Sequence, residues 1–308
     1  MSEICRSGFA ALIGRPNAGK STLVNRLVGQ KISIVTPRPQ TTRNRIQGIV
    51  NRPDAQVVLI DTPGLHRPDS VLGKQMSQEV EAAIEGVDVV ALLLDASEPL
   101  GQSELRAIAR AQTFPGPRLL LLNKVDRVDK PTLLPLIERC QREGEFAEII
   151  PISALKGTGV EDALAAMIAR LPEGPPLFPP DQITDQPERF LAAEIVREKA
   201  MIATREEVPH AVAVVVESFE ESPKIVRISA VVHVEREGQK GILIGAGGQT
   251  LKRIGTEARR ELETLLGTKV FLELRVRVSR DWRDNPALVR QMDWRRQLEQ
   301  LGGSDSQE

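Results

Sequence analysis

Over the first 171 residues, short apolar runs alternate with stretches in which apolar positions recur every three to four residues. The apolar runs lie at residues 9–14, 55–61, 88–96, 118–126 and 146–153, and the helical stretches at 21–29, 70–86, 102–112, 131–143 and 160–171. This alternation predicts an α/β fold, in which helices cover both faces of a mostly parallel sheet. Ligands of such sheets bind where the strands end, so we expect functional residues in the loops after the strands.

The pattern breaks where six prolines between residues 172 and 187 exclude a helix or a central strand. Beyond them, the sequence predicts an amphipathic helix at 190–207, strands at 210–220, 224–237 and 269–280, and two helices flanking the glycines at 245–248. The expected division is a first domain at 1–171, an extended linker at 172–187, a smaller α-β-β-α-α-β domain at 188–283 and a polar tail at 284–308 with one short helix.

Composition indicates the cellular setting. The net charge of -1 gives no overall field that would attract a nucleic acid or a membrane, so any such surface must be local. Cys5 and Cys140 fit no metal-ligand spacing, and the sequence shows neither a secretory signal nor a transmembrane segment. These features predict a soluble protein in the reducing cytoplasm.

GRPNAGKS, residues 14–21, matches the phosphate-loop pattern G-x-x-x-x-G-K-[ST] between an apolar run and a helical stretch. Gly14 and Gly19 let the backbone turn its N–H groups toward phosphate oxygens. Lys20 is expected to reach the β- and γ-phosphates, and Ser21 to be a ligand of Mg²⁺. The other residues predicted to line this loop are Arg15, Pro16, Asn17, Ala18 and Thr22.

DTPG, residues 61–64, follows the second long apolar run. Asp61 is expected to hold Mg²⁺ directly or through water, and Gly64 to offer its N–H to a γ-phosphate. Thr62 and Pro63 complete the predicted loop. An aspartate before Pro-Gly is also ordinary turn chemistry, so the motif has meaning mainly beside the phosphate loop.

NKVD, residues 123–126, indicates which base is bound. Asp126 can accept two hydrogen bonds from the N1–H and the exocyclic amine of guanine, a donor pair that adenine lacks. Asn123 can contact the base edge and fix the loop, while the stem of Lys124 can cover the base. A further loop after a strand contains Ser153, Ala154 and Leu155, and the Ala154 N–H can donate to guanine O6. The sequence therefore predicts GTP or GDP with Mg²⁺.

These four motifs, in this order, resemble a translation-factor-type small GTPase domain related to Ras-like proteins. The resemblance implies a P-loop GTPase fold and identifies PQTTRNR, residues 39–45, as the first switch segment, in which Thr42 would close over Mg²⁺ and the γ-phosphate. The candidate catalytic residues are then Asn17, Lys20, Thr42 and Gly64.

One position departs from the Ras pattern, because Leu65 stands where those proteins have a glutamine that orients water. We therefore expect slow intrinsic hydrolysis. Asn17 resembles the asparagine with which related GTPases hold K⁺ beside the phosphates, which predicts stimulation by K⁺; alternatively, Asn17 only caps the loop. A general-base role for His66 is the less favoured hypothesis. Arg43 and Arg45 could contact RNA or a partner, but a solvated face of the switch is the favoured place for both.

A second glycine cluster lies in GILIGAGGQTLKRIG, residues 241–255. Its spacing does not fit a dinucleotide loop, and a plain helix–turn–helix corner is one alternative. The pattern I-G-x-x-G-x-x-[IL]-K-x-I resembles a type II KH domain of the α+β class, in which this loop approaches single-stranded RNA. The resemblance implies a groove between the loop and the strand at 226–235, with RNA contacts from Ile244, Gly245, Ala246, Gly247, Gly248, Lys252 and Arg253.

Charge and aromatic content qualify this interpretation. Residues 239–283 contain ten Lys or Arg against five Asp or Glu, which favours contacts with phosphates. Aromatic residues are scarce, so recognition would depend on backbone contacts and hydrogen bonds more than on stacking. Trp282 and Trp294 are expected to pack inside the fold.

Residues 8–283 as a whole resemble the Era family of bacterial GTPases, on PRPQTTR, DTPGLH, the VERE…IGxxGxxLKxIG run and the DWR at 281–283. The resemblance implies a maturation factor that binds the 3′ end of small-subunit ribosomal RNA and acts on the 30S subunit or its precursor. It also implies peripheral association with the inner face of the cell membrane. The alternative is a GTPase switch that acts on a protein or membrane partner through an adaptor domain that binds no RNA.

Overall fold

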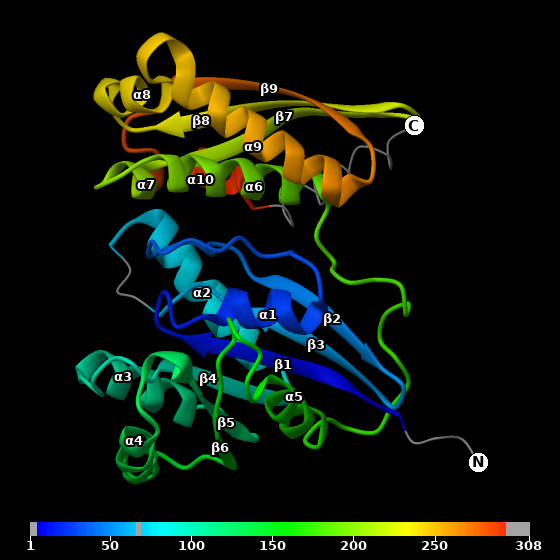
Figure 1. Ribbon diagram of the computed structural model, residues 1–308, viewed down its shortest axis with the longest axis vertical. Coiled ribbons are helices and arrows are strands. Elements are labelled where there is room, and N and C mark those ends of the chain that lie inside the picture. Colours follow the sequence, from blue (N-terminus) through cyan, green and yellow to red (C-terminus); the bar gives the residue numbers. More distant parts are fainter. Residues whose placement is uncertain (1–4, 66–68, 294–308) are drawn as a thin grey trace. The chain divides into compact units, whose positions relative to one another are not determined.

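The structure is a computed structural model that describes residues 5–65 and 69–293 (Figure 1). The described chain forms two compact units, and along its main course the boundary falls between Asp185 and Gln186. His66 and Trp294 lie outside the described residues, as does the predicted tail beyond residue 293.

The first unit contains a six-stranded sheet with the order β2-β3-β1-β4-β5-β6. Its strands are β1 (Arg6–Gly14), β2 (Ile46–Arg52), β3 (Ala55–Asp61), β4 (Val89–Asp95), β5 (Arg118–Asn123) and β6 (Glu148–Pro151). Neighbouring strands are parallel except for β2, which is antiparallel to β3. Strands β1, β3 and β4 are almost entirely buried, because helices cover the sheet on both faces.

The helices of this unit are α1 (Lys20–Val28), α2 (Val71–Glu85), α3 (Gln102–Gln112), α4 (Lys130–Glu143) and α5 (Val160–Ile168). Apolar side chains of α2, α3 and α4 form one core with β1, β4 and β5, while α1 and α5 contact each other on the opposite face (Figure 1). This arrangement confirms the predicted P-loop GTPase fold and sets the carboxyl ends of the parallel strands at one edge of the sheet.

Strand β2 was missed by the hydrophobic pattern, and Gly48 shows why. A glycine inside IQGIVNR interrupts the apolar run that would mark a strand. In the structure, a Cβ at Gly48 would lie 2.8–2.9 Å from side-chain atoms of Val24, Val28 and Ile32. Glycine at this position therefore allows α1 and the segment after it to pack closely on β2.

Hydrogen bonds fix the proline-rich segment at residues 172–187 to the first unit. The buried side chain of Gln56, on β3, accepts hydrogen bonds from the N–H groups of Leu177 and Phe178, at 2.7 and 2.9 Å. Its amide nitrogen donates to the Phe178 carbonyl at 2.8 Å. The Thr184 hydroxyl donates to the Gln47 carbonyl of β2 at 2.7 Å, so these contacts continue as far as Thr184.

The second unit has a three-stranded sheet with the order β7-β8-β9, in which β7 is antiparallel and β9 parallel to the central β8. Its elements are α6 (Glu188–Ala203), α7 (Val208–Ala211), β7 (Ala213–Ser222), β8 (Ile225–Val234), α8 (Glu237–Ile244), η2 (Ala246–Gly248), α9 (Gln249–Leu266), β9 (Lys269–Val278), η3 (Trp282–Asp284) and α10 (Pro286–Gln291). Helices α6, α8 and α9 share one apolar core with the sheet. The order matches the α-β-β-α-α-β prediction and the type II KH fold.

Trp282 is the first residue of η3, which follows β9, and it packs inside the second unit. Its side chain is fully buried, and the indole N–H donates to the carbonyl oxygen of Ala211 at 2.7 Å. A buried indole with a satisfied donor is a packing residue, which agrees with the prediction for Trp282.

Candidate functional site

The phosphate loop connects β1 to α1 and places Lys20 inside the first unit. Lys20 is only 5% exposed, and its Nζ donates to the carbonyl oxygens of Gly14 and Arg15 at 3.1 Å each. Burial lowers the pKa of Lys20 to about 8, although the negative charge of Asp61 partly opposes this effect. The ammonium is thus held on the loop where the motif predicts an anionic ligand.

This pKa predicts a pH dependence of nucleotide affinity. A phosphate beside Lys20 stabilises the ammonium form, so binding takes up a proton once free Lys20 is neutral. We expect the affinity for GDP to be constant below pH 8 and to fall above it, by at most about tenfold per pH unit. Titrations with a fluorescent GDP between pH 6.5 and 9 would measure this.

Lys20→Arg is the matched control for the pH prediction. Its guanidinium does not titrate in this range, so the weaker affinity of this variant should be flat across the same pH values. An equal fall in both proteins would show that another group, in the protein or in the nucleotide, causes the pH dependence.

Asp61, at the end of β3, gathers the hydroxyl groups predicted to bind Mg²⁺. Ser21 Oγ donates to Asp61 Oδ2 at 2.6 Å and lies 2.9 Å from Thr42 Oγ1, which donates to the same carboxylate oxygen at 3.4 Å. Burial raises the pKa of Asp61, while the charge of Lys20 and these hydroxyls lower it. The other oxygen, Oδ1, is buried, and no described residue donates a hydrogen bond to it. This oxygen-rich group of side chains fits a hard cation such as Mg²⁺.

The DTPG loop packs against the phosphate loop. The Thr62 hydroxyl donates to the Leu12 carbonyl at 2.7 Å in the interior, so this side chain anchors the loop to β1. A Cβ at Gly64 would lie 2.5 Å from the backbone nitrogen of Pro16, a distance that no side chain tolerates. Gly64 is thus required for the close approach of the two loops. We infer that Thr62 contributes to the site by fixing the position of the DTPG loop.

Asn123 joins the phosphate loop to the loop at residues 153–155. Its Nδ2 donates to the Ala18 carbonyl at 2.7 Å, and its Oδ1 accepts from the Ala154 N–H at 2.9 Å. Both polar atoms of this buried side chain therefore have partners within the protein. These contacts support the loop-fixing part of the prediction, whereas the Ala154 N–H predicted for guanine O6 here donates to Asn123.

Asp126 lies in the short helix η1 (Val125–Arg127), and its carboxylate is oriented by Ser153. The Ser153 hydroxyl donates to Asp126 Oδ1 at 2.5 Å and accepts from the Lys156 N–H at 3.0 Å. The hydrogen bond from Ser153 lowers the pKa of Asp126, so the carboxylate is ionised at neutral pH. An exposed, ionised and oriented carboxylate is suited to the two donors of guanine.

Lys124 is positioned by Asp95, a residue that sequence reasoning did not select. Lys124 has a left-handed backbone conformation, with φ of 67°, and its ammonium pairs with Asp95 Oδ2 at the end of β4. Ser97 holds the other oxygen, through its N–H at 3.0 Å and its hydroxyl at 2.6 Å. Burial raises the pKa of Asp95, but the hydrogen bonds from Lys124 and Ser97 lower it by more than burial raises it. The pKa of Asp95 is therefore below its usual value.

If Asp95 orients Lys124 over the base, Asp95→Asn should speed the release of GDP. The ion pair is partly shielded from solvent, so we expect an increase of about fivefold, which corresponds to roughly 1 kcal/mol. Stopped-flow displacement of a fluorescent GDP would measure the release rate.

A double-mutant cycle tests whether Asp95 acts through Lys124. Asp95→Asn should have less than about a twofold effect when Lys124 is already alanine. Additive effects of the two substitutions would instead mean that Asp95 supports the fold independently of the lysine.

Two arginines add contacts that the motifs did not reveal. Arg26, on α1, donates through Nε to the Ala154 carbonyl at 2.5 Å and also binds the Leu155 carbonyl. Arg15 pairs with Glu104 of α3. The partners are 128 and 89 residues away along the chain, so local sequence carried no signal for either contact.

The first switch segment is less solvated than expected. Arg43 is only 4% exposed, so its predicted place on a solvated face is wrong. Arg45 is half-buried and pairs with Glu79 of α2 at 3.8 Å. Asn17 is exposed and has a left-handed backbone conformation, with φ of 62°.

In the second unit, the GAGG loop joins α8 to α9. Gly247 and Gly248 have φ of 56° and 79°, a region that residues with side chains seldom adopt. A Cβ on either residue would meet no atom within 4 Å, so this part of the loop borders open space. The loop therefore presents bare backbone at its surface, as close approach to another chain requires.

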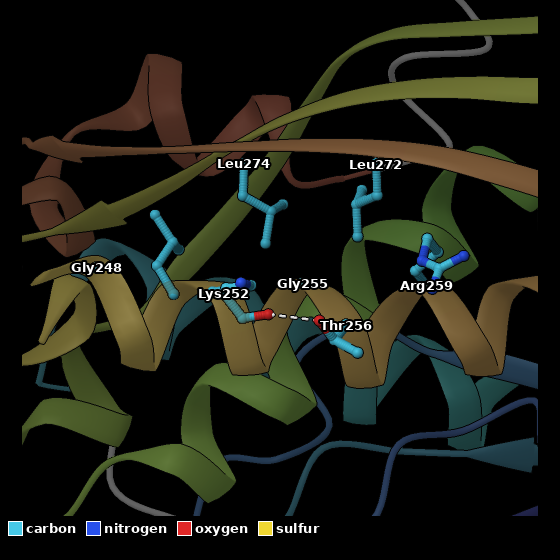
Figure 2. A pocket seen from close by; sticks show the side chains of 8 residues that line it. Gly248, Lys252, Gly255, Thr256, Arg259, Leu272 and Leu274 are labelled. Atoms are coloured by element: carbon cyan, nitrogen blue, oxygen red, sulfur yellow. Dashed lines mark hydrogen bonds between the residues drawn. The ribbon is translucent and has the colours of Figure 1, made fainter.

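A groove of about 410 Å³ extends from the loop between α9 and β9 (Figure 2). Gly248 lies at one end of the drawn stretch of α9 and Arg259 at the other, while Leu272 and Leu274 of β9 point toward the helix. The lining residues are Gly248, Leu251, Lys252, Gly255, Thr256, Arg259, Leu272 and Leu274. An apolar floor with two cations at its rim is suited to bases and phosphates respectively.

The prediction that the strand at 226–235 borders this groove is wrong. That strand is β8, which lies in the middle of the sheet between β7 and β9. Because β9 pairs with β8 alone among the described strands, it forms an edge of the sheet, and it contacts α9. Of the residues predicted to contact RNA, Gly248 and Lys252 line the groove; the others lie in the loop or on the helices beside it.

Comparison with known proteins finds a family match in each part of the chain. The family model described as 50S ribosome-binding GTPase matches residues 9–124, and the KH domain model matches residues 207–283. A crystal structure of an Era variant from Aquifex aeolicus, bound to GDP and AlF4⁻, is similar with 43% identity and a TM-score of 0.89 over 93% of this chain and 98% of that chain. A crystal structure of Era with MgGDPNP and nucleotides 1506–1542 of 16S ribosomal RNA is similar with 43% identity and a TM-score of 0.90, over 94% and 98% of the two chains.

Proposed function

The chain belongs to the Era family of GTPases, and from this we propose that it is a GTP-hydrolysing switch that binds the 3′ end of small-subunit ribosomal RNA. One observation supports this most strongly: almost the whole chain matches a family structure that holds both a GTP analogue and 16S ribosomal RNA. Assistance in assembly or maturation of the small subunit, on the 30S particle or its precursor, is the role that such a switch would serve.

We propose that the first unit binds GTP through side chains that the loops at the ends of its strands already bring together. Lys20 would turn from the loop carbonyls to the phosphates, and Ser21, Thr42 and Asp61 would hold Mg²⁺, which neutralises phosphate charge when bound. Asp126 would select guanine, with Ser153 fixing its carboxylate. Asn123 and Arg26 would hold the loop at residues 153–155, which faces the base, in a fixed position relative to the phosphate loop.

We expect slow intrinsic hydrolysis because Leu65 cannot orient water. Its half-buried side chain packs against the core formed by α2, α3 and α4. Asn17 would supply the missing charge indirectly by holding K⁺ near the phosphates. Single-turnover hydrolysis should then be about tenfold faster in K⁺ than in Na⁺ and insensitive to the cation in Asn17→Ala. Equal wild-type rates in the two salts would leave Asn17 with a loop-capping role only.

We propose that the groove along α9 and β9 binds the single-stranded RNA. The bare backbone of the GAGG loop, the apolar floor and the cation Lys252 support this assignment. Fluorescence anisotropy should show submicromolar binding of a labelled oligonucleotide from the 3′ end of 16S RNA, and at least about tenfold weaker binding of its scrambled sequence. Equal binding of both would argue for a nonspecific cationic surface.

Two points bear on the partner and its location. The name of the matched GTPase family refers to the 50S subunit, but that match covers only residues 9–124 of the first unit. Co-sedimentation with 30S in preference to 50S subunits would distinguish the two partners.

A ribosomal partner favours a cytoplasmic location. No helix among the described residues is both long and apolar enough to cross a membrane, and peripheral membrane contact stays a prediction.

A further inference from the structure

A second groove, with a larger volume of about 900 Å³, meets the first at Arg259, which lines both. Its lining residues are Lys224, Arg259, Glu263, Gly267, Thr268 and Lys269. Gly248 and Arg259 stand toward opposite ends of the first groove in Figure 2. The second groove therefore extends the first one along α9, away from the GAGG loop.

The elements around this second groove bring two lysines to the same end of the sheet. Lys224 lies in the turn that joins β7 to β8, and Lys269 is the first residue of β9. Ile225, which follows Lys224, is the register partner of Lys269 in the parallel pair of β8 and β9. The two ammonium groups thus belong to neighbouring positions on adjacent chain segments.

The charge of the second groove is not balanced within the protein. Glu263 pairs with Arg259 at 3.0 Å and accepts from the Val270 N–H at 3.3 Å, so these two charges offset each other. Lys224 and Lys269 are exposed, and neither has an ion pair with any described residue. Lysines near the C-terminus of α9 would also stabilise that helix. Helix stabilisation alone, however, does not explain why they line a groove that is continuous with the first one.

We propose that the RNA strand in the first groove continues into the second, where Lys224 and Lys269 neutralise its phosphates. This inference rests on the proposed RNA-binding function and extends it beyond the four nucleotides that a GxxG loop and its groove hold. An extended polyanion is the occupant that fits, because the groove is open, cationic and lacks an aromatic lining residue.

RNA length gives a direct test. Lys224→Ala/Lys269→Ala should weaken binding of an RNA of about ten nucleotides by roughly fivefold to tenfold near 100 mM salt, and should leave a tetranucleotide within about twofold. The slope of log affinity against log salt for the longer RNA should fall by about 1.4, as expected for two lost contacts with single-stranded phosphates.

Matched variants keep the test specific. Lys130→Ala/Arg205→Ala removes two exposed charges elsewhere and should behave as wild type, while Lys224→Arg/Lys269→Arg should retain the affinity. Unchanged binding of the longer RNA, or equal losses for both lengths, would overturn the continued path. If wild-type protein binds neither RNA, the proposed RNA-binding function itself fails.

Discussion

Gly248→Asp is expected to weaken single-stranded RNA binding strongly while leaving the fold and the nucleotide site intact. Gly248 lines the first groove, and a Cβ there would meet no atom within 4 Å, so an aspartate would clash with no neighbour, although the φ of 79° strains the backbone of any residue other than glycine. A carboxylate at this point would repel a nearby phosphate by about 1–3 kcal/mol, or roughly 5- to 150-fold in affinity. Anisotropy with the labelled 16S oligonucleotide at low salt would measure the loss.

Gly248→Asn separates the charge from the backbone effect. Asparagine has the shape of aspartate and tolerates the left-handed conformation at least as well, so it should retain RNA affinity within about threefold. GDP affinity and the melting temperature should match in the two variants. Equal loss of RNA binding by asparagine and aspartate would mean that loop conformation, not phosphate repulsion, is responsible.

Asp126→Asn should change the preferred base from guanine to xanthine. The wild-type carboxylate, oriented by Ser153, accepts both donors of guanine, whereas an amide turns one of these positions into a donor. Xanthine carries a carbonyl oxygen where guanine has its exocyclic amine, so it suits the amide. We expect GDP affinity to fall by about a hundredfold or more, and the xanthine nucleotide to become the tighter ligand in competition titrations.

Two further variants test the assignment to Asp126. Asp126→Ala should lose guanine affinity without gaining xanthine affinity, because it neither accepts nor donates. Ser153→Ala should weaken GDP binding less, by several-fold, since the carboxylate remains but is no longer held. Unaltered GDP affinity in Asp126→Asn would place base recognition elsewhere.

The fold could be predicted from the sequence where a helical periodicity or a long apolar run marked a single helix or strand. Helices α2, α3 and α4 follow the helical stretches within a residue or two, and the long apolar runs of β1, β3, β4 and β5 are strands. Strand β2 escaped because Gly48, which close packing against α1 requires, interrupts its apolar pattern. The fixed course of the proline-rich segment also escaped, since its contacts depend on Gln56, a residue with no local signal.

The candidate sites divide in the same way. Residues inside motifs were predictable because phosphates, Mg²⁺ and guanine demand particular groups at particular spacings. The residues that position them were not, since Asp95 and Arg26 act on loops far along the chain. The choice of strand beside the RNA groove was wrong for a similar reason: the strand order, which puts β8 in the middle and β9 at an edge, is a property of the folded sheet.

Coupling between nucleotide and RNA is the central claim for a switch of this kind. The most direct test is the affinity for a single-stranded 3′-end fragment of 16S RNA, measured with protein saturated by a non-hydrolysable GTP analogue and with protein saturated by GDP. We predict tighter binding with the analogue, by about tenfold or more, a coupling of at least roughly 1.4 kcal/mol. Equal affinity in the two states would contradict a GTP-controlled RNA switch.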